Sequence, residues 1–241
     1  MATCCEAGTD SVTNTVTSVT IAIMNTAEKV EIIPAINTEM FDEVERRVRL
    51  VEPYSSWVHL DIADGTFTKN TIWHDARDLV GFRTPLKIEA HLMVRDIDTR
   101  IAEWLQAPIA RIIFHLEAGH DPNVVIAQCR KAGKQVGLAI VPDTSWIQLQ
   151  PYWDRVDLVQ TLGVHPGLAG QEIQPETYEK IAHLRASCPS CTIEADGGMK
   201  VGTARRAALK GANIIVAASA IFGSEDIGQA IDKLKRDVAV N

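Results

Sequence analysis

The chain has 241 residues, of which 46% are hydrophobic, 23% are charged and 5% are aromatic. This composition is that of a globular domain, and it excludes a disordered polymer, a collagen and a disulfide-dense secreted module. With 31 acidic and 24 basic side chains the formal net charge is −7, which argues against nucleic acid as a partner because phosphate backbones are bound by basic surfaces. No apolar run approaches the roughly 20 residues that span a bilayer, so no membrane partner is expected.

The first 28 residues differ in composition from the rest of the chain. They are rich in Thr and Ser, and the first basic side chain is Lys29. A secretory signal would need a positively charged start followed by an apolar run, and a transit peptide would need arginines. We therefore expect residues 1–28 to form a poorly ordered extension, residues 29–241 to form the folded domain, and the protein to be cytoplasmic.

From Val30 onward, short aliphatic or β-branched runs alternate with amphipathic helical patterns. Eight of these runs are predicted to be strands, because they are short and rich in Val, Ile and Leu. The predicted strands are Val30–Ile36, Trp57–Ile62, Leu86–Leu92, Arg111–His115, Gln135–Ile140, Val156–Leu162, Thr192–Ala195 and Asn213–Ala217.

The segments between these strands carry helical signals. Apolar side chains at helical spacing over residues 41–51 predict an amphipathic helix with charged residues on its other face. Asp121 followed by Pro122 is typical of a helix start, and Gly133 is typical of a helix end. A last helix is predicted over residues 225–237.

Eight strand–helix units in about 210 residues indicate a parallel sheet with right-handed crossovers. A doubly wound sheet and a closed (β/α)₈ barrel are the two architectures compatible with this order. The length favours a single (β/α)₈ TIM barrel, which typically takes about 200–250 residues. No G-x-G-x-x-G sequence follows the first strand, which counts against a dinucleotide-binding fold.

Polar side chains lie where three of the predicted strands end. His59 and Asp61 are two residues apart on the second strand and therefore share one face, His91 ends the third strand, and Asp196 follows the seventh. In a (β/α)₈ barrel the functional groups project from these carboxyl ends. Two imidazoles and two carboxylates at one barrel mouth predict a site for one divalent metal ion, with Zn²⁺ expected and Fe²⁺, Mn²⁺ or Co²⁺ as alternatives.

The remaining histidines are expected to have lesser roles. His115, at the end of the fourth strand, is at the correct end of the barrel, and we expect it to support or pack against the site. His74, His120 and His183 are predicted to be solvated residues of loops or helix faces.

Small residues gather in the loops after the last three predicted strands. Such loops often bind phosphate in barrels, because glycine lets backbone N–H groups approach the anion. The candidate phosphate-binding residues are Gly167, Gly170, Gly197, Gly198, Ala218 and Ser219. The acidic net charge does not oppose such a site, which needs no lysine.

The chain has five cysteines, and Cys188 and Cys191 form a C-x-x-C pair. A single pair of this kind is weak evidence for redox or zinc chemistry. It lies where a helical pattern ends and a strand begins, and we expect two incidental thiols.

Four motifs, taken together and in order, resemble the ribulose-phosphate 3-epimerase family. They are HLDIADG at residues 59–65, HLMV at 91–94, VHPGLAGQ at 164–171 and EADGG at 194–198. The resemblance is collinear over Val30–Lys235 and implies a metal-binding (β/α)₈ barrel. It assigns His59, Asp61, His91 and Asp196 as metal ligands and adds Met93 to the substrate-binding residues.

The reaction that the resemblance implies inverts C3 of a sugar phosphate, interconverting D-ribulose 5-phosphate and D-xylulose 5-phosphate. A proton next to the ketone must leave one face and another must arrive on the opposite face, through an enediolate. Two carboxylates can exchange the roles of base and acid, and Asp61 and Asp196 are the candidates. The resemblance also implies a place in the pentose phosphate pathway and a small sugar phosphate as the partner. Members of the family commonly associate, which implies a homo-oligomer.

The chain departs from the family in the pocket. Residues that are larger or polar in the family are here Ala35, Ala63, Leu162 and Leu168, whereas Lys69 and His165 are additional polar groups. An epimerase or isomerase for another sugar phosphate, such as a ketohexose 6-phosphate, is therefore an alternative. A non-catalytic sugar-phosphate-binding barrel is another. A decarboxylase or aldolase of related barrels is disfavoured, because residues 61–64 lack the lysine of the Asp-x-Lys-x-x-Asp motif.

Overall fold

The computed structural model describes Met1 and residues 30–167 and 170–239. These residues form a closed barrel of eight parallel strands, in which each strand pairs with the next and β8 pairs with β1. The strands are β1 (Glu31–Ile36), β2 (Trp57–Ala63), β3 (Lys87–Met93), β4 (Arg111–His115), β5 (Gln135–Ile140), β6 (Leu158–Leu162), β7 (Ile193–Asp196) and β8 (Ile214–Ala217). The predicted TIM barrel is confirmed. The predicted extension, apart from Met1, and the pocket residue Leu168 lie outside the described residues.

All eight predicted strands are present, and β4 and β5 have the predicted bounds. The largest difference is at β6, which begins at Leu158 rather than at Val156. A short 3₁₀ helix, Trp153–Arg155, occupies the chain immediately before it. Val156 and Asp157 form a bend before the strand, and the Asp157 side chain accepts a hydrogen bond from the backbone N–H of Val136 at 2.6 Å.

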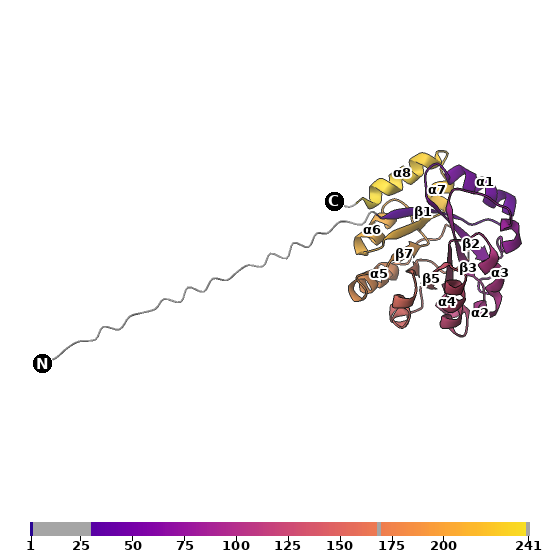
Figure 1. The fold of residues 1–241 in the computed structure, drawn as a ribbon. Helices are drawn as coiled ribbons and strands as arrows, with labels where there is room; N and C mark the ends of the chain where they lie inside the picture. The colour runs from indigo at the N-terminus through magenta and orange to yellow at the C-terminus, as the bar shows by residue number, and fades with distance from the viewer. Residues whose placement is uncertain (2–29, 168–169, 240–241) are drawn as a thin grey trace.

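Helices surround the barrel and cover the outer face of its strands (Figure 1). They are α1 (Phe41–Val51), α2 (Ile97–Arg100), α3 (Ala102–Gln106), α4 (Pro122–Lys131), α5 (Glu176–Ser187), α6 (Thr203–Lys210), α7 (Ser219–Phe222) and α8 (Ile227–Val238). The predicted start of α4 is confirmed, since the Asp121 side chain accepts a hydrogen bond from the N–H of Asn123. Short 3₁₀ turns occur at Ala76–Leu79, Leu116–Ala118, Trp146–Leu149 and Trp153–Arg155.

The hydrophobic core has two layers, as the alternation of the strands requires. One layer lies between strands and helices, and α1 contributes Val44, Val48 and Val51 to it. The second is a smaller cluster on the opposite face of the strands, inside the barrel. Its members are Ile33, Ala35, Trp57, Ile113, Ala139, Leu158, Ile214 and Val216. Buried polar side chains, among them His59, Glu89, Gln160 and Glu194, share the barrel interior with this cluster.

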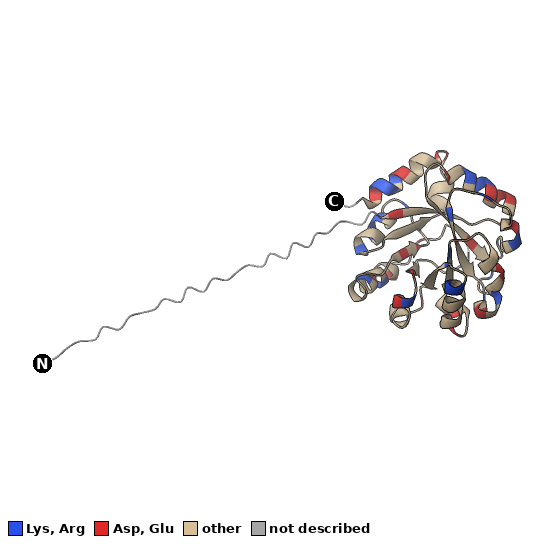
Figure 2. Ribbon diagram, viewed as in Figure 1, with Lys and Arg blue, Asp and Glu red and all other residues tan. Residues whose placement is uncertain are grey.

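The surface carries both signs of charge. Figure 2 shows Lys and Arg interspersed with Asp and Glu over the outer helices. Within the described part of the chain, no helix is both long and apolar enough to cross a membrane.

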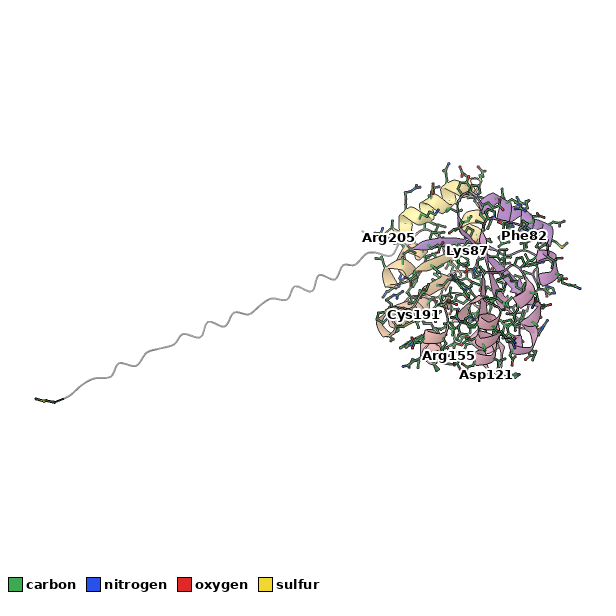
Figure 3. The ribbon with its side chains drawn as sticks, in the orientation of Figure 1. Phe82, Lys87, Asp121, Arg155, Cys191 and Arg205 are labelled. Atoms are coloured by element: carbon green, nitrogen blue, oxygen red, sulfur yellow. A yellow bond between two sulfur atoms is a disulfide. The ribbon has the colours of Figure 1, made fainter. Side chains whose placement is uncertain are left out.

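The expectation of two free thiols at Cys188 and Cys191 is wrong, because the structure joins them in a disulfide. The chain turns directly after α5, where the Cys188 N–H donates to the Leu184 carbonyl and the Cys191 N–H donates to the Cys188 carbonyl. This turn brings the two Cα atoms to 5.4 Å, within the range that a disulfide spans. Figure 3 labels Cys191, which is half-buried. Cys129 is a buried free thiol.

Candidate active site

The four predicted metal ligands converge inside the mouth of the barrel. Asp61 on β2 lies opposite His91 on β3 in the parallel register, and His59 is on the same face two residues earlier. Asp61 Oδ1 is 3.3 Å from His59 Nε2 and 3.1 Å from His91 Nδ1. Asp196 approaches from β7, and its Oδ2 is 3.9 Å from His59 Nε2 and 3.6 Å from His91 Nδ1. One ligand atom from each residue lies within 4.8 Å of the others.

The donor set fits a divalent metal ion. His59 and His91 are 0% exposed and Asp196 is 8% exposed, and imidazole nitrogens with carboxylate oxygens are donors that Zn²⁺ and similar ions accept. Among the described residues, His59 Nε2 has no hydrogen-bond partner although it is buried. A buried imidazole nitrogen without a hydrogen-bond partner, lying near two carboxylates, fits the role of a metal ligand.

The negative charges of the carboxylates around His59 also favour a bound cation. Burial acts to lower the pKa of His59, but its contacts with Asp61 and Glu89 outweigh this and raise that pKa well above the usual range. The carboxylates around His59 thus stabilise a positive charge at the centre of the barrel. A bound divalent ion would supply that charge in place of the proton.

The two carboxylates differ in their affinity for a proton. Burial acts to raise the pKa of Asp61, but the neighbouring imidazoles of His59 and His91 outweigh it and hold this pKa well below the usual range. Burial raises the pKa of Asp196 to about 6, with the nearby Asp61 charge adding to the effect. Two carboxyl groups whose pKa values are separated in this way can serve as a base and an acid at neutral pH.

Behind His59 lies a buried ion pair that sequence reasoning missed. The His59 Nδ1–H group donates to Glu89 Oε1 at 2.8 Å, which leaves Nε2 free to face the site. Arg111 donates to the other oxygen of Glu89 at 2.6 Å, and its guanidinium lies 4.1 Å from the ring centre of Trp57. Glu89 precedes His91 by two residues on β3, so strand alternation places the two side chains on the same face, although it does not identify the partners of Glu89. A carboxylate that orients a metal-binding histidine raises the affinity of the site for the ion.

We expect Glu89→Gln to lower the affinity for Zn²⁺ about 10- to 100-fold, the usual effect of removing such a carboxylate. The free energy of unfolding should also fall by about 3 kcal/mol, because Arg111 then remains buried without its partner charge. Titration calorimetry with Zn²⁺ and urea denaturation measure the two effects. Glu103→Gln, an exposed glutamate on α3, is the control. Unchanged Zn²⁺ affinity in Glu89→Gln would show that Glu89 does not support the site.

His115 lies next to the site and supports it by contact, as expected. Its Nε2 is 2.8 Å from His91 Nε2, and its ring stacks on Phe67 at 4.7 Å. Burial lowers the pKa of His115 to about 4, so the ring is neutral and can accept the His91 N–H. The other predicted histidines are exposed, in agreement with the sequence: they are His74, His120 and His183.

A cavity opens on the same end of the barrel. It is lined by Asp61, His91 and Asp196 together with the predicted substrate-binding residues Met93, Gly167, Gly170, Gly197, Gly198, Ala218 and Ser219. Gly198 has a φ of +71°, and a Cβ atom there would lie 2.6 Å from the backbone nitrogen of Ile173. Only glycine therefore fits at this position, which brings the backbone of the β7 loop up to the cavity.

The residues that depart from the family take different positions. Leu162 lines the cavity, whereas Ala35 and Ala63 are buried outside its described lining. Lys69 and His165 are exposed side chains and are likewise absent from that lining.

Two amides at the site were not predicted, and they are Asn37 and Gln160. The Gln160 amide donates to Glu194 at 3.1 Å and to Asp196 Oδ2 at 3.3 Å. Gln160 is fully buried, and burial raises the pKa of Glu194 well above its usual range. Asn37 donates to Asp61 Oδ2 at 3.2 Å. Strand alternation predicts that Gln160 lies on the inner face of β6 and that Asn37 lies on the same face just after β1. It does not predict the hydrogen-bond partners of either amide.

Comparisons with known proteins agree with the motifs. The sequence model of the ribulose-phosphate 3 epimerase family matches residues 31–222. A relative from Oryza sativa subsp. japonica, named ribulose-phosphate 3-epimerase, cytoplasmic isoform, is 35% identical over 81% of this chain and 87% of its own length. The ribulose-phosphate 3-epimerase of Schizosaccharomyces pombe is 30% identical over 86% of this chain and 93% of its own.

Solved structures with lower sequence identity share the fold. The 3-hexulose-6-phosphate synthase from Salmonella typhimurium is 14% identical, with a TM-score of 0.68 over 86% of this chain and 98% of that chain. The orotidine 5′-phosphate decarboxylase from Pyrococcus horikoshii is also 14% identical, with a TM-score of 0.63 over 87% and 100%. At such identities the similarity concerns the barrel alone.

Proposed function

This chain belongs to the ribulose-phosphate 3-epimerase family, and from this we propose that it inverts C3 of a ketose phosphate, interconverting D-ribulose 5-phosphate and D-xylulose 5-phosphate. The observation that carries the proposal is the meeting of Asp61 and Asp196 with two buried histidines at the cavity. Epimerisation needs two groups that exchange protons with one carbon, and these carboxylates are the two at the cavity whose pKa values are shifted in opposite directions.

The residues that would hold the metal are His59, Asp61, His91 and Asp196. When bound, a divalent ion would supply Lewis-acid stabilisation to the oxygens of the substrate that become negative during the reaction. We propose Zn²⁺, with Fe²⁺, Mn²⁺ and Co²⁺ as alternatives, on the basis of the mixed nitrogen and oxygen donors. Glu89 would orient His59, and the neutral His115 would orient His91.

The proton transfers follow from the chemistry of C3. One carboxylate takes the proton from C3, and the electron pair of the C–H bond moves toward the C2 ketone to give an enediolate. The other carboxyl group delivers its proton to the opposite face of C3, which inverts the centre. Asp61 and Asp196 exchange these roles in the reverse direction, and each proton transfer contributes roughly 10²–10⁴-fold to the rate.

The phosphate group of the substrate would bind at the small-residue loops. Gly197 and Gly198 follow β7, and Ser219 begins α7 after β8. These residues line the cavity together with Asp196. In barrels such loops bind phosphate through N–H groups without requiring a lysine.

Incubation with D-ribulose 5-phosphate in D₂O tests the function. We expect deuterium at C3 of both pentulose phosphates, because a proton taken by a carboxylate exchanges with solvent before it returns. Mass spectrometry and NMR locate the label, and a ketohexose 6-phosphate serves as the comparison substrate. Exchange with the hexulose phosphate alone would make the protein an epimerase for that sugar. Exchange with neither would favour a binding barrel without activity.

The remaining expectations concern the whole molecule. We propose residues 29–241 as one catalytic domain, with a small sugar phosphate as its partner. The homo-oligomer stays a prediction. So does a cytoplasmic location, which the name of the rice relative supports.

A further inference from the structure

Asn37 lies directly after β1, at the mouth of the barrel. Ala35 on β1 pairs with His59 on β2, so the register, continued by two residues, places Asn37 beside Asp61. Strand alternation also puts Asn37 on the same face as Ala35, which belongs to the inner layer of the core. The side chain is half-buried and lines the cavity together with Asp61 and Asp196.

The two oxygens of Asp61 face different partners. Oδ1 lies 3.3 Å from His59 Nε2 and 3.1 Å from His91 Nδ1. Oδ2 accepts a hydrogen bond from Asn37 Nδ2 at 3.2 Å. The two oxygens of the carboxylate therefore have different roles. Oδ1 lies beside the histidines of the proposed metal site, and Oδ2 is held by Asn37.

We propose that Asn37 is a positioning residue that holds Oδ2 of Asp61 as the oxygen exchanging a proton with substrate C3. The proposal rests on the proposed epimerase function and adds a residue to it. In the forward step the C3–H bond breaks, its proton passes to Oδ2, and its electron pair enters the enediolate. In the reverse step Oδ2 returns the proton to C3. Without Asn37 the carboxylate can rotate about its Cβ–Cγ bond, and Oδ2 is no longer fixed toward the cavity.

Asp196 is held in a different way. The Gln160 amide donates to Oδ2 of Asp196, which is the same oxygen that faces His59 and His91. Asn37 is therefore coupled by contact to only one of the two carboxylates. Its loss should slow proton transfer at Asp61 and leave proton transfer at Asp196 intact.

Because Asn37 contacts Asp61 and not Asp196, its loss should change the ratio of deuterium labelling to inversion differently for the two substrate epimers. For the epimer whose proton Asp196 takes, the enediolate still forms quickly, but delivery from Asp61 is slow. The enediolate then returns to its starting epimer after exchange with solvent, which labels the substrate without inverting it. For the other epimer, removal of the proton by Asp61 is itself slow, so labelling and inversion decline together.

The experiment compares the metal-loaded wild-type protein with Asn37→Ala and Asn37→Leu, starting from each pentulose phosphate in D₂O. We expect kcat to fall about 10- to 100-fold in both variants, the range for loss of a hydrogen bond to a charged group. The ratio of deuterium incorporation to inversion should rise at least about fivefold for one epimer and stay near the wild-type ratio for the other. Thermal melting of both variants checks that the barrel is folded.

Asn70→Leu is the matched control, because the Asn70 amide donates to the Gly167 carbonyl at 3.0 Å at the edge of the cavity and does not contact Asp61. It should change KM more than kcat and keep the two ratios equal to those of the wild type. A rise in KM for the Asn37 variants with unchanged ratios would make Asn37 a substrate contact and overturn the proposal. If the wild-type protein neither labels nor inverts either sugar, the epimerase function fails and the role of Asn37 falls with it.

Discussion

Replacing Asp196 with asparagine is expected to lower kcat for epimerisation by at least about 10³-fold, because the amide can neither take nor deliver a proton at C3. The substitution keeps the size of the side chain and the hydrogen-bonding capacity next to Gln160. Binding of inorganic phosphate should persist, because the glycine loops on the same side of the cavity are unchanged. A coupled assay of pentulose phosphate conversion and a phosphate titration by calorimetry measure the two effects.

Asp143→Asn is the matched control for this substitution. Asp143 is a carboxylate with an 81% exposed side chain, and its Oδ2 lies 3.9 Å from Nδ1 of the exposed His165. The control changes the net charge by the same amount without touching the site, and it should retain wild-type kcat. If Asp196→Asn were also fully active, two-carboxylate catalysis by Asp61 and Asp196 would be refuted.

Replacing His91 with alanine is expected to remove the metal. The substitution removes one of the four donor groups. Loss of a residue that only hydrogen-bonds a metal ligand lowers metal affinity by up to about 100-fold. We therefore expect the affinity for Zn²⁺ to fall by more than this when a ligand itself is removed. Elemental analysis of purified protein should give about one divalent ion per chain for the wild type and much less than one for His91→Ala. Activity should fall in parallel.

His120→Ala provides the control, because the His120 side chain is 85% exposed and lies outside the site. It should keep both metal content and activity. Treatment of the wild-type protein with a chelator should reproduce the effect of His91→Ala, and added Zn²⁺, Fe²⁺, Mn²⁺ or Co²⁺ should restore turnover to different extents, which ranks the metals. Full activity after the metal has been stripped would contradict the proposed role of the ion.

The barrel could be predicted because its signals are local. A buried strand appears in the sequence as a short aliphatic run, and a helix appears as spacing at 3.6 residues with recognisable ends. These signals identified all eight strands, and the alternation of side chains along β2 identified the face shared by His59 and Asp61. These signals misplaced the start of β6, because the apolar residue Val156 lies in a bend before the strand. Periodicity does not distinguish the first residue of a strand from an apolar residue that lies just before it.

The supporting residues of the site could not be predicted in the same way. Glu89 and Gln160 were visible as polar residues within strands, but a buried polar group can be explained only when its partner is known. Their partners are His59 and Asp196, which are 30 and 36 residues away along the chain. The disulfide between Cys188 and Cys191 likewise depends on the turn that follows α5, which brings the two Cα atoms to 5.4 Å.

The sequence by itself therefore determined the order of the elements, the barrel class and the four residues that meet at its mouth, because strand alternation and the parallel order of β/α units are local rules that place every strand end at the same edge. The tertiary structure decided which atoms face one another. Closure of the barrel brings β7 across from β2 and turns Oδ1 of Asp61 toward the histidines and Oδ2 toward Asn37. These orientations result from packing and hydrogen bonding between distant segments, which no local pattern encodes.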